Sequence, residues 1–231
     1  MKDVMTFLMR DELLNADIID CLRFGGEVIK STDDGVLVRT AKTIYAIDAL
    51  SKESYIELGK YVPKEKGVDI CAHQPRFAPV LAGGRSEDTK LLPCWEYVHS
   101  KELIEEKELD GISFRELNAD DLPFVYDNYG ETKEYIDRCF KGGMIGAFEG
   151  EKCVGFIGLH PNGEVGLLQV PEAYRKRGIG TGLEARMTNR RIKEGHTPYN
   201  FVVVGNEASI KLQDALGYKK AERMVTWVLE K

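Results

Sequence analysis

Apolar positions in the second half of the chain recur with two different periods, and these periods predict its elements. Short apolar runs, which favour strands, occur at 112–117, 144–148, 153–159, 164–170, 201–204 and 224–229. Apolar residues three and four positions apart, which favour helices, occur at 118–129, at 131–140, after residue 178 and at 206–217. The predicted order is strand, two helices, three antiparallel strands, helix, strand, helix and strand.

The first hundred residues show a looser version of this order. An amphipathic helix is expected at 11–22, a short helix at 51–60, and strands at 27–30, 36–39, 43–47 and 68–71. The charged run from Lys101 to Asp110 is typical of a solvated linker or helix. We therefore expect two domains, residues 1–105 and 106–231, of which the first is a smaller α+β domain.

A basic, glycine-rich turn stands between the apolar run at 164–170 and the helical pattern after it. It reads Arg175-Lys176-Arg177-Gly178-Ile179-Gly180-Thr181-Gly182. Glycines let backbone N–H groups approach a ligand closely, and the first turn of a helix has N–H groups without intrahelical partners. The helix dipole adds partial positive charge there. The pattern predicts a site for a pyrophosphate.

Two common phosphate loops do not fit this turn. A Walker loop needs Gly-x-x-x-x-Gly-Lys-Ser/Thr, which is absent here. A dinucleotide fingerprint needs a glycine where this chain has Leu183. The alternative is a surface helix that merely starts with cations, an arrangement the helix dipole disfavours unless an anion intervenes.

The motif Arg-x-x-Gly-x-Gly closely resembles the coenzyme A pyrophosphate loop of the GNAT acetyltransferase superfamily. A second segment, Asn206-x-x-Ser209 followed by Leu216-Gly217-Tyr218, resembles that superfamily's second signature. The resemblance covers Gly111 to Lys231. Through Gly195-His196-Thr197-Pro198-Tyr199 it is nearest to the glycine N-acyltransferase-like branch. It implies an α+β GNAT fold with a central mixed, splayed sheet, in which residues 1–105 form a degenerate half of the same kind or a small α+β domain.

The resemblance implies an acetyl-CoA site and assigns residues to it. The pyrophosphate is expected at Arg175, Lys176, Arg177, Gly178, Ile179, Gly180, Thr181 and Gly182. The backbone of Leu168, Gln169 and Val170 is expected to pair with the pantetheine arm and the thioester oxygen, an oxyanion-type contribution. Asn206 is expected to assist at the cofactor arm, although it is also a good helix N-cap.

Glu164 is the expected general base, because it lies eleven positions before Arg175, as the glutamate base does in the histone-acetylating branch. The alternative is a surface glutamate beside a turn, with Glu149, Glu151 or His160 as weaker candidates for the base. One departure concerns the general acid. Where relatives often carry a tyrosine, this chain has Gln213, which cannot donate the proton. Tyr174 and Tyr199 are substitutes without positional support.

Composition narrows the classes of partner. The 231 residues carry a formal net charge of -6, which disfavours a general nucleic-acid binder. Five scattered cysteines without a Cys-x-x-Cys pair favour reduced thiols in a cytoplasm. Four histidines far apart predict no metal site. No signal peptide or membrane span is expected.

These observations favour an N-acyltransferase that moves an acetyl group from acetyl-CoA to a primary amine by direct attack in a ternary complex. The acceptor is expected to be a small-molecule or peptide amine, without nucleic-acid or membrane partners, and a homodimer stays open. The alternative is a non-catalytic acyl-CoA-binding or sensor module, which Gln213 favours.

Overall fold

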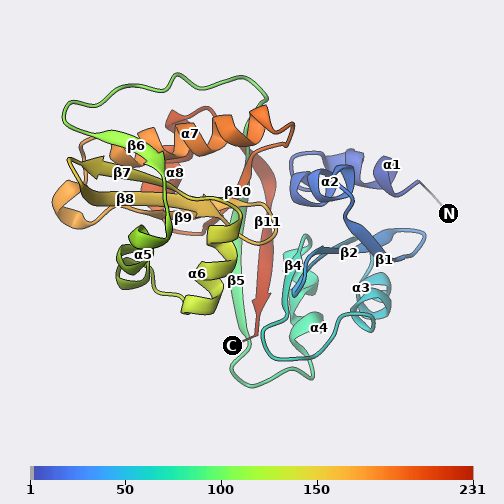
Figure 1. Ribbon diagram of the computed structural model, residues 1–231. Helices are drawn as coiled ribbons and strands as arrows, with labels where there is room; N and C mark the ends of the chain where they lie inside the picture. The colour runs from blue at the N-terminus through green and yellow to red at the C-terminus, as the bar shows by residue number, and fades with distance from the viewer. Residues whose placement is uncertain (1–2, 231) are drawn as a thin grey trace. The chain divides into compact units, whose positions relative to one another are not determined.

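The computed structural model describes residues 3–230 of the chain (Figure 1). Contacts between Cα atoms divide the chain into two compact units. The first unit comprises Met1–Val98, Phe201–Lys211 and Lys219–Lys231, and the second comprises His99–Asn200 and Leu212–Tyr218.

This division differs from the expected one at 105/106 because the last strand does not stay with the residues that precede it. Strand β11 (Lys219–Leu229) lies between β4 (Asp69–Ala72) and β5 (Lys90–Val98) and is antiparallel to both. Strand β5 was not expected from the sequence, since Pro93 interrupts its pattern. The C-terminal strand therefore belongs to the first unit.

The first unit is built around a seven-stranded sheet of order β1-β2-β3-β4-β11-β5-β10, in which β3 and β4 are parallel. The remaining strands of this sheet are β1 (Glu27–Ser31), β2 (Gly35–Ala41), β3 (Ile44–Ala49) and β10 (Tyr199–Val203), of which β10 spans the division between the units. Its helices are α1 (Val4–Leu8), α2 (Ala16–Arg23), α3 (Lys52–Gly59) and α4 (Ala78–Ala82), with 3-10 turns at Met9–Asp11 and Pro75–Phe77. The single helix expected at 11–22 is therefore replaced by α1, a 3-10 turn and α2.

Side chains of this sheet alternate strictly between two hydrophobic clusters. In β2, Val36 and Val38 pack with Ile18 of α2, whereas Leu37 packs on the opposite face with Leu58 of α3. This alternation is the period of two that a strand imposes. Helices α1 and α2 thus cover one face, and α3 and α4 cover the other.

The second unit contains a four-stranded antiparallel sheet of order β6-β7-β8-β9. Its strands are β6 (Ser113–Glu116), β7 (Ile145–Glu149), β8 (Lys152–Leu159) and β9 (Val165–Gln169). Its helices are α5 (Leu122–Asn128), α6 (Lys133–Lys141) and α7 (Ile179–Lys193), with 3-10 turns at Ala119–Asp121 and Glu172–Tyr174. Helix α8 (Glu207–Ala215) spans the division between the units.

Helix α7 lies on one face of the four-stranded sheet, and α5 and α6 lie on the other (Figure 1). On the first face, Leu183 and Met187 of α7 pack with Val154 and Ile157 of β8. On the second face, Ile136 of α6 packs with the fully buried Phe156. Strand β9 is an edge of this sheet, and β10 belongs to the other sheet.

The charged run at 101–110 is not a helix but a largely exposed segment without regular secondary structure, as expected of a solvated linker. It is attached to α7 at Ile104. Asn189 accepts a hydrogen bond from the backbone N–H of Ile104 and donates one to its carbonyl, both at 2.8 Å. Because both backbone groups of Ile104 bond to the side chain of Asn189, this polar segment is held against α7.

Within residues 3–230, no helix is both long enough and apolar enough to cross a membrane.

Candidate cofactor and catalytic site

Strand β9 contains a bulge directly before the glycine-rich turn. Phe156 of β8 pairs with Gln169 and Gly158 pairs with Gly166, so two residues of β9 lie opposite one residue of β8. Leu167 absorbs the extra residue in a left-handed conformation, with φ of 52°. The apolar run of β9 contains no signal for this bulge.

The bulge changes which way the last residues of β9 point. Val165, Leu168 and Val170 all pack in the cluster beneath α7, whereas Leu167 packs on the opposite face. Unbroken alternation would have placed Leu168 opposite Val165. Because β9 is also a sheet edge, the backbone of Leu168 and Gln169 has one side that the β-ladder does not use.

Two residues in the left-handed region shape the turn into α7. Lys176 has φ of 62°, and Gly178, the N-cap of α7, has φ of 80°. The carbonyl of Gly178 accepts the first helical hydrogen bond, from Gly182 at 2.9 Å. This leaves the amides of Ile179, Gly180 and Thr181 as the first-turn donors of α7 without intrahelical acceptors.

Gly180 and Gly182 of the turn have different surroundings. A Cβ on Gly180 would meet only Leu168 and Val170, at the ordinary contact distances of 3.8 and 3.9 Å. A Cβ on Gly182 would lie 2.7 Å from the ring of Phe114. Gly182 therefore brings α7 close to β6, and its amide is used inside the helix. This differs from its expected place among the pyrophosphate donors.

The cations of the turn are exposed, and two of them have protein partners. The Nε of Arg175 donates to the carbonyl of Val170 at 3.0 Å, which closes the turn onto the end of the β9 segment. Arg177 lies 2.8 Å from Glu149 in an exposed ion pair, a kind worth about 1 kcal/mol or less. An arriving anion can therefore displace Glu149 from Arg177 at small cost. Lys176 is exposed between them.

Asn206 caps a helix. Its Oδ1 accepts from the backbone N–H of Ser209 at 3.2 Å, at the start of α8. It belongs to the first compact unit, whereas the turn belongs to the second. The capping that its residue type predicts is present.

Glu164 is half-buried and directly precedes β9, within a group that contains Tyr129, Tyr135 and His160. Its carbonyl accepts from the N–H of His160 at 2.9 Å. Burial, followed by the charge of Glu164, holds the pKa of Tyr129 well above its usual range. Both tyrosines occupy apolar positions of the predicted helices at 118–129 and 131–140, a pattern that does not connect them with Glu164.

His160 is a poor base in this setting. Burial lowers its pKa to about 4, so the ring is neutral at pH 7. Its Nδ1 forms a hydrogen bond with the hydroxyl of Tyr135, and its ring lies against Gly166 so closely that any side chain there would collide with it. The geometry leaves Glu164 as the stronger candidate of the two. Glu149 is paired with Arg177, and Glu151 is exposed at the β7–β8 turn.

Gln213 has a structural role that the sequence did not reveal. It is buried and donates from Nε2 to Glu184 of α7 at 2.7 Å, while its Oε1 accepts from Asn200 at 2.8 Å. Burial raises the pKa of Glu184 to about 7. Residues from α7, β10 and α8 thus form one buried polar group.

The tyrosines considered as substitute acids have other partners. The hydroxyl of the buried Tyr199 donates to the carbonyl of Asn162 at 2.6 Å. Tyr218 shares a hydrogen bond of 2.7 Å with Thr188 and is also buried. Tyr174 lies in the turn itself, with Lys152 5.3 Å and Arg177 5.7 Å from its ring centre.

Part of the sequence matches a family model, and the fold is similar to that of solved structures. Residues 144–228 match the family model described as FR47-like protein. A GNAT-family protein from Novosphingobium aromaticivorans is 17% identical with a TM-score of 0.58, covering 94% of this chain and 97% of its own. A GCN5-related N-acetyltransferase from Kribbella flavida is 11% identical with a TM-score of 0.60, covering 94% and 93%.

A Drosophila protein has a TM-score of 0.65 at 18% identity, covering 84% of this chain and 73% of its own. A comparison with curated proteins finds no match. At these identities the likeness shows the fold, a mixed α+β GNAT fold with a splayed sheet. The family model matches residues 144–228, a part of the chain that contains the glycine-rich turn.

Proposed function

We propose that this protein is an acyl-CoA-dependent N-acyltransferase that transfers an acetyl group from acetyl-CoA to a primary amine. The observation that carries the proposal is the start of α7. There, Gly178 turns the chain, the amides of Ile179, Gly180 and Thr181 lack intrahelical acceptors, and three exposed cations precede them. The helix dipole and the positive side chains of such a site both attract a pyrophosphate.

The backbone edge of β9 supports the next part of the site. The bulge at Leu167 turns the segment that leads into α7, and the free side of Leu168 and Gln169 can pair with the amides of a pantetheine arm. An N–H of this edge directed at the thioester oxygen would stabilise the negative charge that develops there.

The reaction follows from these groups. The amine nitrogen attacks the carbonyl carbon of the thioester, and Glu164, directly or through water, accepts the proton that the amine loses. The carbon–sulfur bond then breaks, and coenzyme A leaves as a thiolate. A thiol has a pKa of about 8.5, so water can return the proton without a tyrosine at the position of Gln213.

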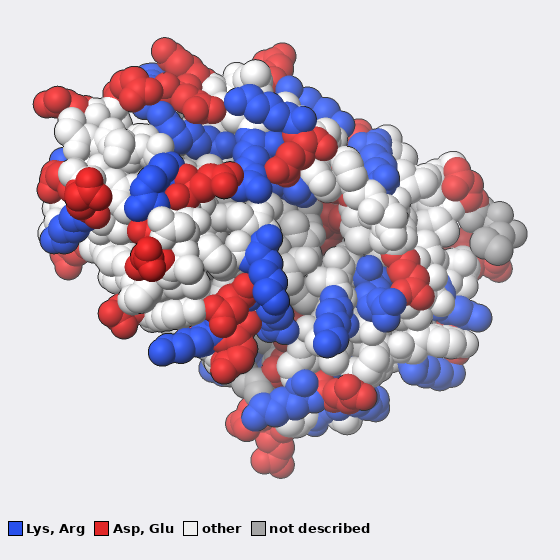
Figure 2. Space-filling view, in the orientation of Figure 1, with Lys and Arg blue, Asp and Glu red and all other residues white. Residues whose placement is uncertain are grey.

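The acceptor is proposed as a small-molecule or peptide amine, and the glycine N-acyltransferase-like branch is the proposed placement. On the face shown in Figure 2, acidic and basic side chains are interspersed and form no continuous basic stripe. Together with the net charge of -6, this supports the exclusion of nucleic acid as a partner. The cysteine pattern supports a cytoplasmic location.

A second candidate is a non-catalytic acyl-CoA-binding or sensor module. It is favoured by the buried hydrogen bonds of Gln213, which fill the position of an expected acid with a structural group. Both candidates bind acetyl-CoA, but only the enzyme releases free coenzyme A in proportion to an added amine. A screen of amino acids, polyamines, aminoglycosides and peptides for thiol release separates them.

The cofactor site itself is tested with Gly180→Glu. The new carboxylate would occupy the space beside the free amides and repel an anion, while an acidic residue in a first helical turn is otherwise mildly favourable. We expect calorimetry to show one acetyl-CoA per wild-type chain and at least a roughly 100-fold weaker affinity in the variant, because hydrogen bonds to a charged group are lost. Unchanged binding by a normally melting variant would place the cofactor elsewhere.

A further inference from the structure

A group of metal-type ligands is buried in the first unit. Asp17, Cys71 and His73 each offer one ligand atom, and these atoms lie within 4.8 Å of one another. The three residues are 2%, 1% and 0% exposed. We propose that they bind one divalent transition-metal ion of the zinc type. This proposal does not depend on the acyl transfer proposed above.

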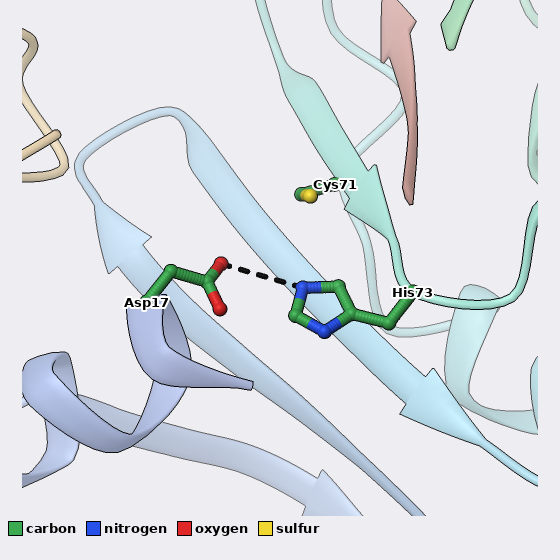
Figure 3. A group of neighbouring side chains, drawn as sticks. All are labelled: Asp17, Cys71 and His73. Carbon is green, nitrogen blue, oxygen red and sulfur yellow. Dashed lines mark ion pairs between the residues drawn. The ribbon is translucent and has the colours of Figure 1, made fainter. Parts of the chain in front are cut away.

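The fold brings the three side chains together from distant parts of the chain. Cys71 in β4 and His73 just after it are two positions apart, so both face the side of the sheet that α2 covers. Asp17 lies in the first turn of α2. Figure 3 shows its carboxylate directed at the imidazole of His73, with Cys71 on strand β4, which His73 follows. The prediction of no metal site took no account of the Cys-x-His spacing of Cys71 and His73. No sequence motif links Asp17 to these two residues.

Asn15 determines which nitrogen of His73 is available. The amide of Asn15 donates to the carbonyls of Leu8 at 3.0 Å and Asp11 at 3.1 Å, so its Oδ1 faces Nδ1 of His73, at 2.9 Å, as an acceptor. Nδ1 therefore carries a proton. Metal-bound histidines use this arrangement, in which one ring nitrogen donates to an oxygen and the other is left for the ion.

The distance between His73 and Asp17 suits a shared ion. Nε2 of His73 has no hydrogen-bond partner and lies 3.3 Å from Oδ2 of Asp17. Charge-assisted hydrogen bonds are shorter, at about 2.7–2.9 Å. Two ligands bound at about 2.0–2.2 Å to a tetrahedral zinc ion are separated by roughly 3.4 Å. The observed distance therefore fits two neighbouring ligand atoms of one metal ion better than a direct ion pair.

The charges of the region also favour a cation. A divalent ion is balanced by the carboxylate of Asp17 and a thiolate of Cys71, which makes the buried group neutral. Glu96, which is fully buried, accepts from the backbone N–H of Asp17 at 3.2 Å and adds negative potential. The rival is a proton on Nε2 in place of the metal. Burial opposes that proton, but Asp17 and Asp48 raise the pKa of His73 overall.

The test measures the metal in the full-length chain. Protein stripped with a chelator and returned to zinc should retain about one zinc per chain after gel filtration, as one three-ligand site requires. Zinc at about one hundred times its dissociation constant should raise the melting temperature by about 5–10 °C. Cobalt in place of zinc should give the thiolate-to-cobalt charge-transfer absorption that reports a bound cysteine.

Matched variants locate the ion. Cys71→Ala should lose the zinc, the cobalt absorption and the melting shift, whereas Cys94→Ala should keep all three. Cys94 is 2% exposed and belongs to the same hydrophobic cluster, so both variants remove the same group from similar surroundings. If Cys71→Ala does not fold, Asp17→Asn and its control Asp20→Asn, two buried carboxylates of α2, take its place.

Two outcomes would overturn the proposal. One is a wild-type protein that neither retains zinc nor shows the cobalt absorption, which would leave a protonated His73 beside Asp17. The other is equal zinc retention by Cys71→Ala and Cys94→Ala, or by the two aspartate variants, which would place bound zinc elsewhere.

Discussion

The two compact units differ in where they hold their charges. In the second unit, the cations of the glycine-rich turn are exposed. In the first unit, Asp17, Asp20, Asp48 and Glu96 are all at most 3% exposed. An exposed cation keeps its hydration until a ligand replaces the water, whereas a buried carboxylate needs a permanent partner. The exposed cations of the turn therefore suit a ligand that binds and dissociates, whereas the buried carboxylates of the first unit need partners within the fold.

The same contrast applies inside the second unit. Glu164 is half-buried beside two tyrosines, while Glu184 is fully buried among amide groups. A base must exchange its proton with a substrate, so partial exposure suits Glu164. Glu184 can exchange its proton only with difficulty, and its hydrogen bonds make it part of the core.

The largest expected effect is on turnover. Glu164→Gln keeps the size of the side chain but removes the base, so we expect turnover with an amine acceptor to fall by ~10²–10⁴-fold while acetyl-CoA affinity stays the same. Steady-state kinetics and calorimetry measure the two quantities, with Glu222→Gln as the exposed control. Wild-type turnover with an unchanged acidic limb of the pH profile would make Glu164 structural.

The next effect compares a buried ion pair with an exposed one. Asp48 is fully buried and lies 2.6 Å from Arg10, whose side chain is 25% exposed. Asp48→Asn should lower the free energy of unfolding by about 3 kcal/mol, because a partly buried arginine loses its partner. Glu149→Gln, which breaks the exposed pair with Arg177, should cost about 1 kcal/mol or less. Equal costs in urea unfolding would refute the distinction drawn between the units.

A third effect depends on pH. Burial raises the pKa of Glu184 from 4.5 to about 7 in the folded state, so between these values the folded protein holds a proton that the unfolded chain has released. Stability attributable to Glu184 should therefore fall as pH rises through this range, by roughly 3 kcal/mol in all, and level off above it. The difference in unfolding free energy between wild type and Glu184→Gln, measured from pH 4.5 to 8, should show this slope. A difference that stays constant with pH would mean that Glu184 titrates normally.

The smallest effect distinguishes the two glycines of α7. Gly182→Ala should destabilise the protein by about 1–3 kcal/mol, because its Cβ would lie 2.7 Å from Phe114. Gly180→Ala should be neutral or stabilising, since alanine favours a helix by roughly 1 kcal/mol over glycine and its Cβ has room. Thermal melting of both variants measures this. A greater loss for Gly180→Ala would reverse the roles given to the two positions.

Most elements of the second unit could be predicted because their signals are local. The turn at Gly150, the cap at Asn118 and the glycine-rich loop each act within a few residues. Strand β5 was missed because Pro93 weakens the local strand pattern, whereas pairing with β11 stabilises the strand in the fold. The bulge at Leu167 was missed because an apolar run has the same sequence pattern whether or not the strand contains a bulge.

The sequence by itself therefore determined most elements of the second unit and the glycine-rich loop, since these rest on spacing along the chain. Glu164 became the candidate base through the resemblance to the GNAT superfamily. Only the tertiary structure decided that Gly182 packs on Phe114, that Gln213 bonds to Glu184, and that β11 joins the first unit. The meeting of Asp17 with Cys71 and His73 was decided in the same way. Each of these depends on which faces of distant segments are buried against each other, and burial between distant segments has no local signature in a sequence.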